Sequence, residues 1–197
     1  TFTGTAGGGY GTGQYFSFDA GDYFTAKAQP TYADELHKDN AKWSVCAWVY
    51  TPDGGYRGVL GTIGDSGATR IGTSFHLTSL ERPGVQVNNG AGAALSFDAD
   101  TSLSVDAWHL IAVSIDEAVG VGGGFLYSDG AYNQVAAADT FNSTYTSPSA
   151  AAATYTLQVA ADGNALTPLI NLSRLGPVAI WQGSVITKAQ FDTIWSN

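Results

Sequence analysis

Short runs in which every second residue is apolar, each ended by glycine, proline or aspartate, most restrict how this chain can fold. In residues 42–55, Trp43, Val45, Ala47 and Val49 occupy alternate positions before a Pro-Asp-Gly turn. Alternation of this kind places one set of side chains on one face of a β-strand. Comparable short strands are expected over residues 14–18, 58–65, 73–80, 84–90, 94–97, 107–116, 125–128, 154–162 and 174–183. Many short strands separated by turns predict an all-β sandwich or barrel.

Two glycine-containing dipeptides predict tight hairpin turns between these strands. Asn89-Gly90 supplies residues that accept a positive φ, and so does Asp129-Gly130. We therefore expect backbone geometry alone to explain Asp129, so that its replacement by Asn has little effect.

One helix is predicted, near the end of the chain. Thr187 and Gln190 have the spacing of a capping box, and Phe191, Ile194 and Trp195 share one helical face. A further helical turn could form over residues 31–40. The first 13 residues are nearly half glycine and predict a linker or an irregular edge segment, so we assign residues 1–13 as a glycine-rich lead-in and residues 14–197 as one domain.

Charge and composition exclude several classes of partner. The net charge is −9 and only eight Lys and Arg are present, which argues against nucleic acid and against anionic membrane surfaces. No stretch approaches the about 18 apolar residues of a membrane helix, and no signal segment opens the chain. The chain begins at Thr1 and lacks Met, so we expect a processed product or a piece of a longer protein. The single Cys46 excludes an internal disulfide and is expected to be a buried strand thiol.

The order of the motifs resembles the concanavalin A-like lectin/glucanase jelly rolls, and among them the laminin-G-like domains. The matching stretches are FSFDAGDYF, WSVCAWVY, WHLIAVSID followed by FLYSDG, and LGPVAIWQGSVITKAQFDTIW, which together span residues 14–197. The resemblance implies an antiparallel two-sheet jelly-roll sandwich of six or seven strands a sheet, with one sheet concave and a short C-terminal helix. It also implies that the first and last strands are adjacent, and that Trp108, Leu110 and Ala112 face the core.

The sequence does not favour an enzyme. Retaining glucanases use two carboxylates about 5–5.5 Å apart, which relatives of this fold take from one Glu-rich strand. Here the three glutamates, Glu35, Glu81 and Glu117, lie far apart in the chain. His76 lies between Phe75 and Leu77 in an alternating run, so it is expected on one face of a sheet. A structural histidine is the simpler interpretation there. A glycoside hydrolase is therefore our third alternative only.

Acidic loops leave calcium as a possible ligand, because calcium prefers several carboxylate and carbonyl oxygens. Laminin-G-like relatives often hold one calcium at a sandwich rim, although no ligand motif of theirs is present here. The candidate metal ligands are Asp98, Asp100 and Asp116, with Asp65 and Glu117 as further members of the acidic clusters. Zinc is disfavoured by one Cys and three dispersed His.

Sugar recognition needs an apolar ring face for stacking and polar groups for the hydroxyls. Three loops offer this combination, and the candidate ligand-binding residues are Tyr56, Arg57, Tyr132, Asn133, Gln134 and Tyr145. Each tyrosine could instead cover its own loop against a sheet.

The sequence therefore predicts a non-catalytic recognition module for a glycan or surface polysaccharide, used in adhesion on an extracellular or virion surface. The main alternative is a structural capsid, tail-decoration or surface-appendage subunit without a ligand. The glycine-rich lead-in favours that alternative, because flexible termini can tether a domain to a larger assembly.

Overall fold

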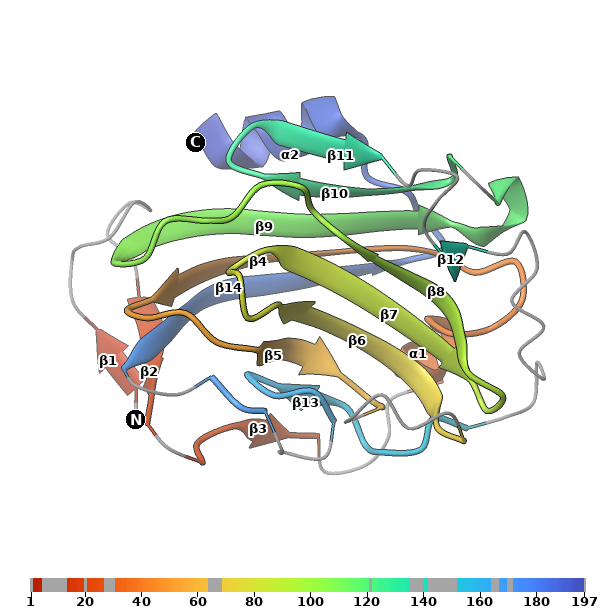
Figure 1. Ribbon diagram of the computed structural model, residues 1–197, viewed down its shortest axis with the longest axis horizontal. Coiled ribbons are helices and arrows are strands. Elements are labelled where there is room, and N and C mark those ends of the chain that lie inside the picture. Colours follow the sequence, from red (N-terminus) through yellow and green to blue (C-terminus); the bar gives the residue numbers. More distant parts are fainter. Residues whose placement is uncertain are drawn as a thin grey trace.

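Two stacked antiparallel sheets form the protein, as the computed structural model shows (Figure 1). The structure describes residues 2–4, 14–19, 21–26, 31–63, 69–120, 122–134, 140–141, 152–163, 167–169 and 172–196. In one sheet, here sheet A, the strand order is β1 (Phe2–Gly4), β2 (Gln14–Phe18), β14 (Ser173–Gln182), β4 (Lys42–Thr51), β9 (Ala107–Asp116), β10 (Gly124–Ser128) and β11 (Ala131–Gln134). In sheet B the order is β12 (Thr140–Phe141), β8 (Ala93–Asp98), β7 (Pro83–Asn89), β6 (Ile71–Leu77), β5 (Arg57–Gly61), β13 (Gln158–Val159) and β3 (Phe24–Thr25).

This arrangement confirms the predicted all-β, two-sheet jelly-roll sandwich. The early strand β2 and the late strand β14 are paired, as the resemblance implied. Described helices are few: α1 (Thr31–Glu35), the 3₁₀ turn η1 (Glu117–Val119) and α2 (Lys188–Ser196). The capping box forms as predicted, because the Thr187 backbone N–H donates to Gln190 Oε1 at 2.8 Å. Residues 154–162 were expected to be one strand, but only Gln158 and Val159 pair with neighbouring strands.

The core between the sheets comes from alternate residues of paired strands. The predicted face of β4 contributes Trp43, Val45, Ala47 and Val49, all at most 1 % exposed. Opposite them lie alternate residues of β6, β7 and β8 (Phe75, Leu77, Val85, Val87, Leu95 and Phe97). Burying these side chains from both sheets supplies the main stabilisation of the sandwich.

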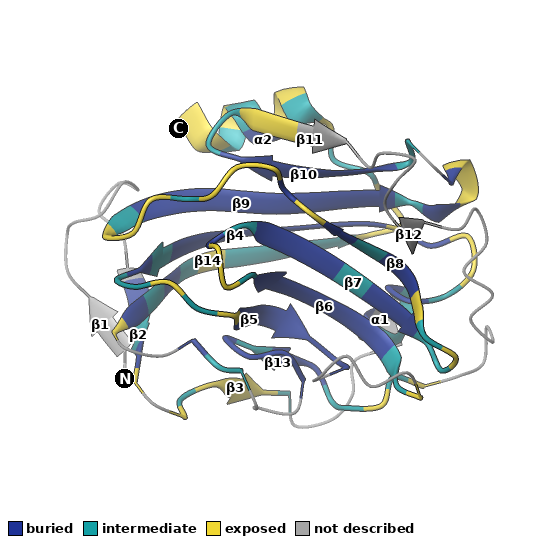
Figure 2. Ribbon diagram, in the orientation of Figure 1, coloured by how far each residue is buried: buried dark blue, intermediate teal, exposed yellow. Residues whose placement is uncertain are grey.

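A second apolar cluster covers the outer face of sheet A. Helix α2 packs there through Phe191, which is fully buried, so β4 and β9 are buried on both faces (Figure 2). Cys46 belongs to this cluster, and burial raises the pKa of its thiol to about 11. Trp108, Leu110 and Ala112 also lie here: they are buried in a core cluster as expected, but in the one under α2 and not in the one between the sheets. Their neighbours Ile111 and Val113 have that place, because strand alternation sends successive residues to opposite faces.

Turn geometry follows the predicted dipeptides in part. Asp129 and Gly130 have φ angles of 48° and 88° and close the β10–β11 hairpin. At the β7–β8 connection the positive φ angles belong to Gly90 and Gly92, while Asn89 ends β7 and accepts the Ala91 N–H through its side chain. The expected positive φ at Asn89 is therefore not adopted. Within the lead-in, Phe2–Gly4 pairs with β2 as an edge strand.

Candidate functional site

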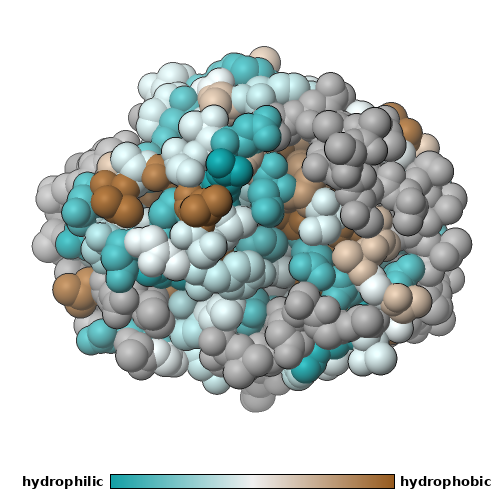
Figure 3. Space-filling model, in the orientation of Figure 1, coloured by the Kyte–Doolittle hydropathy of each residue, from teal (hydrophilic) through white to brown (hydrophobic). Residues whose placement is uncertain are grey.

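The outer face of sheet B carries small and polar side chains. On β6, β7 and β8 the residues between the core positions are Ser74, His76, Gly84, Gln86, Ser96 and Asp98. Strand register sets them in two rows across the sheet: Gly58, His76, Gly84 and Asp98 in one, and Gly61, Ser74, Gln86 and Ser96 in the other. Figure 3 views the molecule from this side, and most of the surface that is not grey there is hydrophilic or intermediate. The face therefore offers polar groups on a rigid support.

Tyr56 lies over these rows, and we call the surface formed by Tyr56, Ser74, His76, Gln86, Ser96 and Asp98 the Tyr56 face. Its ring stacks on His76 with centroids 4.7 Å apart and an interplanar angle of 27°. His76 is 5 % exposed beneath it, whereas Tyr56 keeps 41 % of its surface exposed. One side of the ring is thus held by the protein and the rest is open to a ligand.

Polar groups flank His76 on both sides. Its Nδ1 lies 3.3 Å from Ser74 Oγ, and its Nε2 lies 3.7 Å from Asp98 Oδ1. Gly84 makes this possible, because a Cβ there would lie 2.3 Å from Asp98 Oδ1 and 2.6 Å from His76 Nε2. The Asp98 carboxylate remains about half exposed, with 49 % of its side chain accessible. It is therefore available to a ligand that reaches Tyr56.

Residues 160–163 run closely over β5, next to Tyr56. A Cβ on Gly58 would lie 2.3 Å from the Asp162 nitrogen, and one on Gly61 would lie 2.7 Å from the Asp162 oxygen, so glycine is required at both positions. Asp162 is fully buried, and neither of its carboxylate oxygens has a hydrogen-bond partner. Burial, and to a smaller extent the charges of Asp162 and Asp98, raise the pKa of Tyr56 to about 12, although a hydrogen bond with Ser74 acts in the opposite direction. Two carboxylates therefore act on the exposed ring.

Arg57 supports the loop that presents Tyr56. Its guanidinium is 2 % exposed; Nη1 donates to Glu81 Oε1 at 3.0 Å and Nη2 donates to Asp53. Glu81 also accepts from Thr51 Oγ1 at 2.9 Å and from the Gly55 backbone N–H at 2.9 Å. The expected contact of Arg57 with ligand hydroxyls is therefore not open to it in this structure, because its charged end is used inside the loop.

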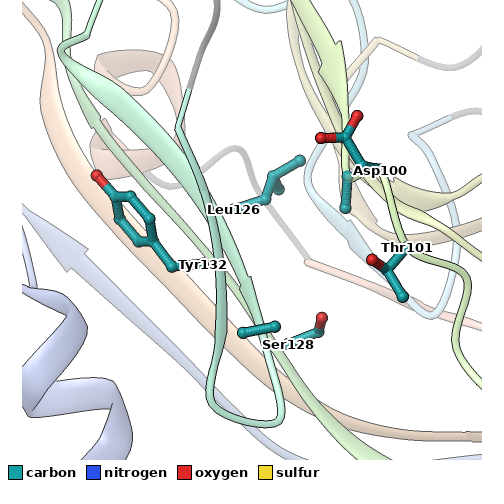
Figure 4. Close-up of a pocket in the computed structure, with 7 residues that line it drawn as sticks. Asp100, Thr101, Leu126, Ser128 and Tyr132 are labelled. Carbon is teal, nitrogen blue, oxygen red and sulfur yellow. The ribbon is translucent and has the colours of Figure 1, made fainter.

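The other candidate ligand-binding residues are not gathered around Tyr56. Tyr132 lies on β11, at an edge of sheet A, and is 44 % exposed with its ring 4.8 Å from Phe125. A small pocket beside it is lined by Asp100, Thr101, Leu126 and Ser128, but Figure 4 shows the Tyr132 ring directed away from Asp100. Asn133 and Gln134 follow on β11, where they pair with Leu126 and Phe125 of β10. Tyr145 lies outside the described residues.

The three candidate metal ligands also lie apart. Asp98 belongs to the Tyr56 face and Asp100 to the pocket beside β10, while Asp116 pairs with Lys42 Nζ at 2.8 Å. Among the described residues, no group of three or more His, Cys, Asp or Glu side chains could hold a metal ion. Glu117 is buried and accepts the Asn40 N–H at 2.6 Å. Asp65 lies outside the described ranges.

The sequence singled out Tyr56 and Asp98, which the structure brings to one face, but as candidates for different ligands. Alternation in residues 73–80 placed His76 on a sheet face correctly and indicated nothing about the ring above it. Ser74 was not singled out, although the same alternation puts it on that face. Nothing local marks Asp162, because its place beside Tyr56 depends on a contact between segments about 100 residues apart.

Solved structures of sialidase-associated domains share the fold. CBM40 of the Ruminococcus gnavus IT-sialidase, bound to α2,3-sialyllactose, superposes with a TM-score of 0.63 at 11% identity over 91% of this chain and 95% of that one. The same domain bound to α2,6-sialyllactose gives 0.60 at 13% identity, with the same coverage. The leech intramolecular trans-sialidase gives 0.62 at 11% identity, but only 26% of that chain is covered. At these identities the likeness establishes the fold.

Sequence comparison identifies the family. No curated protein matches the chain, and no described helix has the length and apolar character needed to cross a membrane. The family model of the concanavalin A-like lectin/glucanases matches residues 18–168, which is well over half of the 197 residues and contains all of sheet B from β3 to β13. The chain therefore belongs to the concanavalin A-like lectin/glucanases superfamily.

Proposed function

We propose that this protein is a non-catalytic carbohydrate-binding module that holds a glycan on the Tyr56 face. The observation that carries the proposal is the partly exposed Tyr56 ring, which stacks on His76 and lies near the half-exposed Asp98 carboxylate. A pyranose presents an apolar face that stacks on such a ring and hydroxyls that donate to nearby acceptors. The similarity to a CBM40 domain solved with sialyllactose supports a carbohydrate ligand.

The polar rows around Tyr56 are suited to sugar hydroxyls. Gln86 and Ser96 are half-buried on neighbouring strands in the row next to Asp98. Sheet pairing fixes their backbone, and Gln86 Nε2 donates to Asn88 Oδ1 at 2.8 Å, so the Gln86 side chain is already oriented before a sugar binds. Such a shallow site on one domain binds weakly, and several copies acting together increase the overall affinity.

The glutamates have structural roles that fit a non-catalytic protein. Glu81 anchors the Tyr56 loop, Glu117 accepts the Asn40 N–H, and Glu35 pairs with Lys38 at 2.6 Å. Glycoside hydrolysis instead requires two carboxylates that flank one bond. We propose that the domain acts outside the cell or on a virion surface, where it binds polysaccharides.

A glycan array probed with a multivalent display of the domain tests the proposal. Tyr56→Ala should abolish binding while the protein stays folded, because Tyr56 is 41 % exposed and lies outside the core clusters. Tyr132→Ala is the matched control, since Tyr132 is similarly exposed on the other sheet. Loss of binding in Tyr132→Ala or Tyr145→Ala, with Tyr56→Ala unaffected, would move the site to those tyrosines. An empty array together with self-association or docking onto a particle would favour the structural-subunit alternative.

Calcium enters the proposal in a narrower form than the sequence suggested. Of the candidate metal ligands we retain Asp98, which belongs to the Tyr56 face and has a carboxylate that is about half exposed. Asp116 is already paired with Lys42. A cation that binds only the folded protein raises its melting temperature. The test is to measure the melting temperature with calcium and with a chelator, for the wild type and for Asp98→Asn. A calcium-dependent rise in melting temperature that is lost in the variant would support the site. Identical wild-type curves would argue against calcium binding.

A further inference from the structure

The charges around Tyr56 have one sign. Asp98 lies on one side of the stacked His76, the backbone of the buried Asp162 packs against Gly58 two residues from Tyr56, and both charges act on Tyr56. Within the described part of the chain, no ion pair joins a Lys or Arg to either carboxylate. Most described basic side chains are engaged elsewhere: Lys38 with Glu35, Lys42 with Asp116, Arg57 with Glu81, Arg70 over Tyr155, Arg174 over Tyr50, and Lys188 with Asp192.

The carboxylate of Asp162 points to a ligand. It is 0 % exposed, and among the described residues neither of its oxygens has a hydrogen-bond donor. A buried carboxylate with no partner is costly, and its field is screened less than that of a surface charge. A positive charge brought to the nearby Tyr56 ring would offset part of that cost, whereas a negative charge would add to it.

An aromatic face beside carboxylates is also the arrangement that attracts an ammonium group. A cation within about 6 Å of a ring centroid is drawn to the negative face of the ring, and tyrosine is among the favourable rings. The exposed side of Tyr56 is free for this contact, because His76 occupies the other side.

We infer that the Tyr56 face selects glycans by charge: it prefers a saccharide with protonated amines and rejects one with a carboxylate. The inference rests on the proposed function and adds the class of ligand. It separates this protein from the CBM40 domain that shares its fold, because that domain was solved with the acidic glycan sialyllactose.

Two pairs of ligands test the inference by calorimetry. Chitosan oligomers and their fully N-acetylated counterparts of equal length share one sugar backbone and differ in whether the amine is free and charged or acetylated and neutral. Sialyllactose is lactose with one further, acidic sugar. At mildly acidic pH and low salt, the charged chitosan oligomer should bind at least about tenfold more tightly than the acetylated one, which corresponds to about 1.4 kcal/mol. Sialyllactose should bind more weakly than lactose. Added salt should reduce both differences.

Single substitutions test which carboxylates cause the preference for protonated amines. Asp162→Asn and Asp98→Asn should each reduce the preference for the amine, while Asp116→Asn, a carboxylate paired with Lys42, should leave it unchanged and controls for the overall negative charge. Equal binding of the two chitosan forms, tighter binding of sialyllactose than of lactose, or a preference unaltered in Asp162→Asn would each overturn the inference.

The two proposals fail in different ways. Binding of neutral or acidic glycans through Tyr56, with the charge order reversed, would overturn the preference and leave the carbohydrate-binding module intact. Absence of binding for all four ligands and on the array would overturn both.

Discussion

Asp162 shows how one residue can serve a site at the expense of stability. Its buried carboxylate has no partner, so removing the charge while keeping the shape should stabilise the unliganded protein. We expect Asp162→Asn to raise the melting temperature, by about 2–4 °C for each 1 kcal/mol gained in a domain of this size. Differential scanning calorimetry provides the measurement. Asp116→Asn is the control and should lower the melting temperature slightly or leave it unchanged; a clear fall for Asp162→Asn would mean that the carboxylate has a stabilising partner.

Asp129 does more than close a turn. Its Oδ1 accepts the Leu110 N–H at 2.8 Å and its Oδ2 accepts from His109 Nδ1, while His109 Nε2 contacts the Ser104 carbonyl at 2.8 Å. Burial lowers the pKa of His109, but the hydrogen bond and charge of Asp129, with the Ser104 carbonyl, outweigh burial, and the pKa lies above its usual 6.5. We therefore expect Asp129→Asn to lower stability, and not to have the small effect that the turn alone would suggest.

The folded-state pKa of His109 is raised, so its protonation adds stability that is fully present below about pH 6.5 and is lost as pH rises through the folded value. Asp129→Asn should remove this contribution and lower the free energy of unfolding by about 1.5–3 kcal/mol at acidic pH, with a smaller difference at alkaline pH. Urea unfolding across pH measures the loss, and NMR titration of His109 should show a lower pKa in the variant. A difference independent of pH would leave only the backbone turn as the role of Asp129.

At the scale of elements, α2 and the outer face of sheet A form a second core. Trp108 is 9 % exposed and packs against Tyr15 and Tyr50 with centroids 5.6 and 5.8 Å away. Trp108→Ala should cost about 3–5 kcal/mol and impair folding. Trp195, stacked on Trp48 but 37 % exposed, is the matched control and should cost distinctly less. Denaturant unfolding compares the two, and equal losses would contradict the burial difference.

For the whole molecule, the prediction is binding without turnover. Incubation with β-glucans, alginate and galactans should release no product, because each of the three glutamates already has a structural partner. Product analysis by chromatography is the measurement. Sustained turnover that disappears in Glu81→Gln or Glu117→Gln, in variants shown by melting to be folded, would identify an enzyme.

Local sequence by itself determined where most strands lie and which side chains share a face. Alternation in residues 42–51 and 73–77 is a property of neighbouring positions, so it correctly grouped Trp43 and Val45 on one face, which the structure buries, and separated His76 from Phe75. The capping pair at α2 and the turn at Asp129-Gly130 were local as well.

Only the tertiary structure decided what those faces meet. Alternation cannot tell which face of a strand a helix covers, so the sequence did not show that Trp108 packs in the cluster under α2 and not between the two sheets. Arg57 could not be separated from a ligand-binding arginine until Glu81 was found beside it. The Tyr56 face depends on strand order and on residues 160–163 packing against two glycines of β5, and such contacts between distant segments leave no local pattern in the sequence.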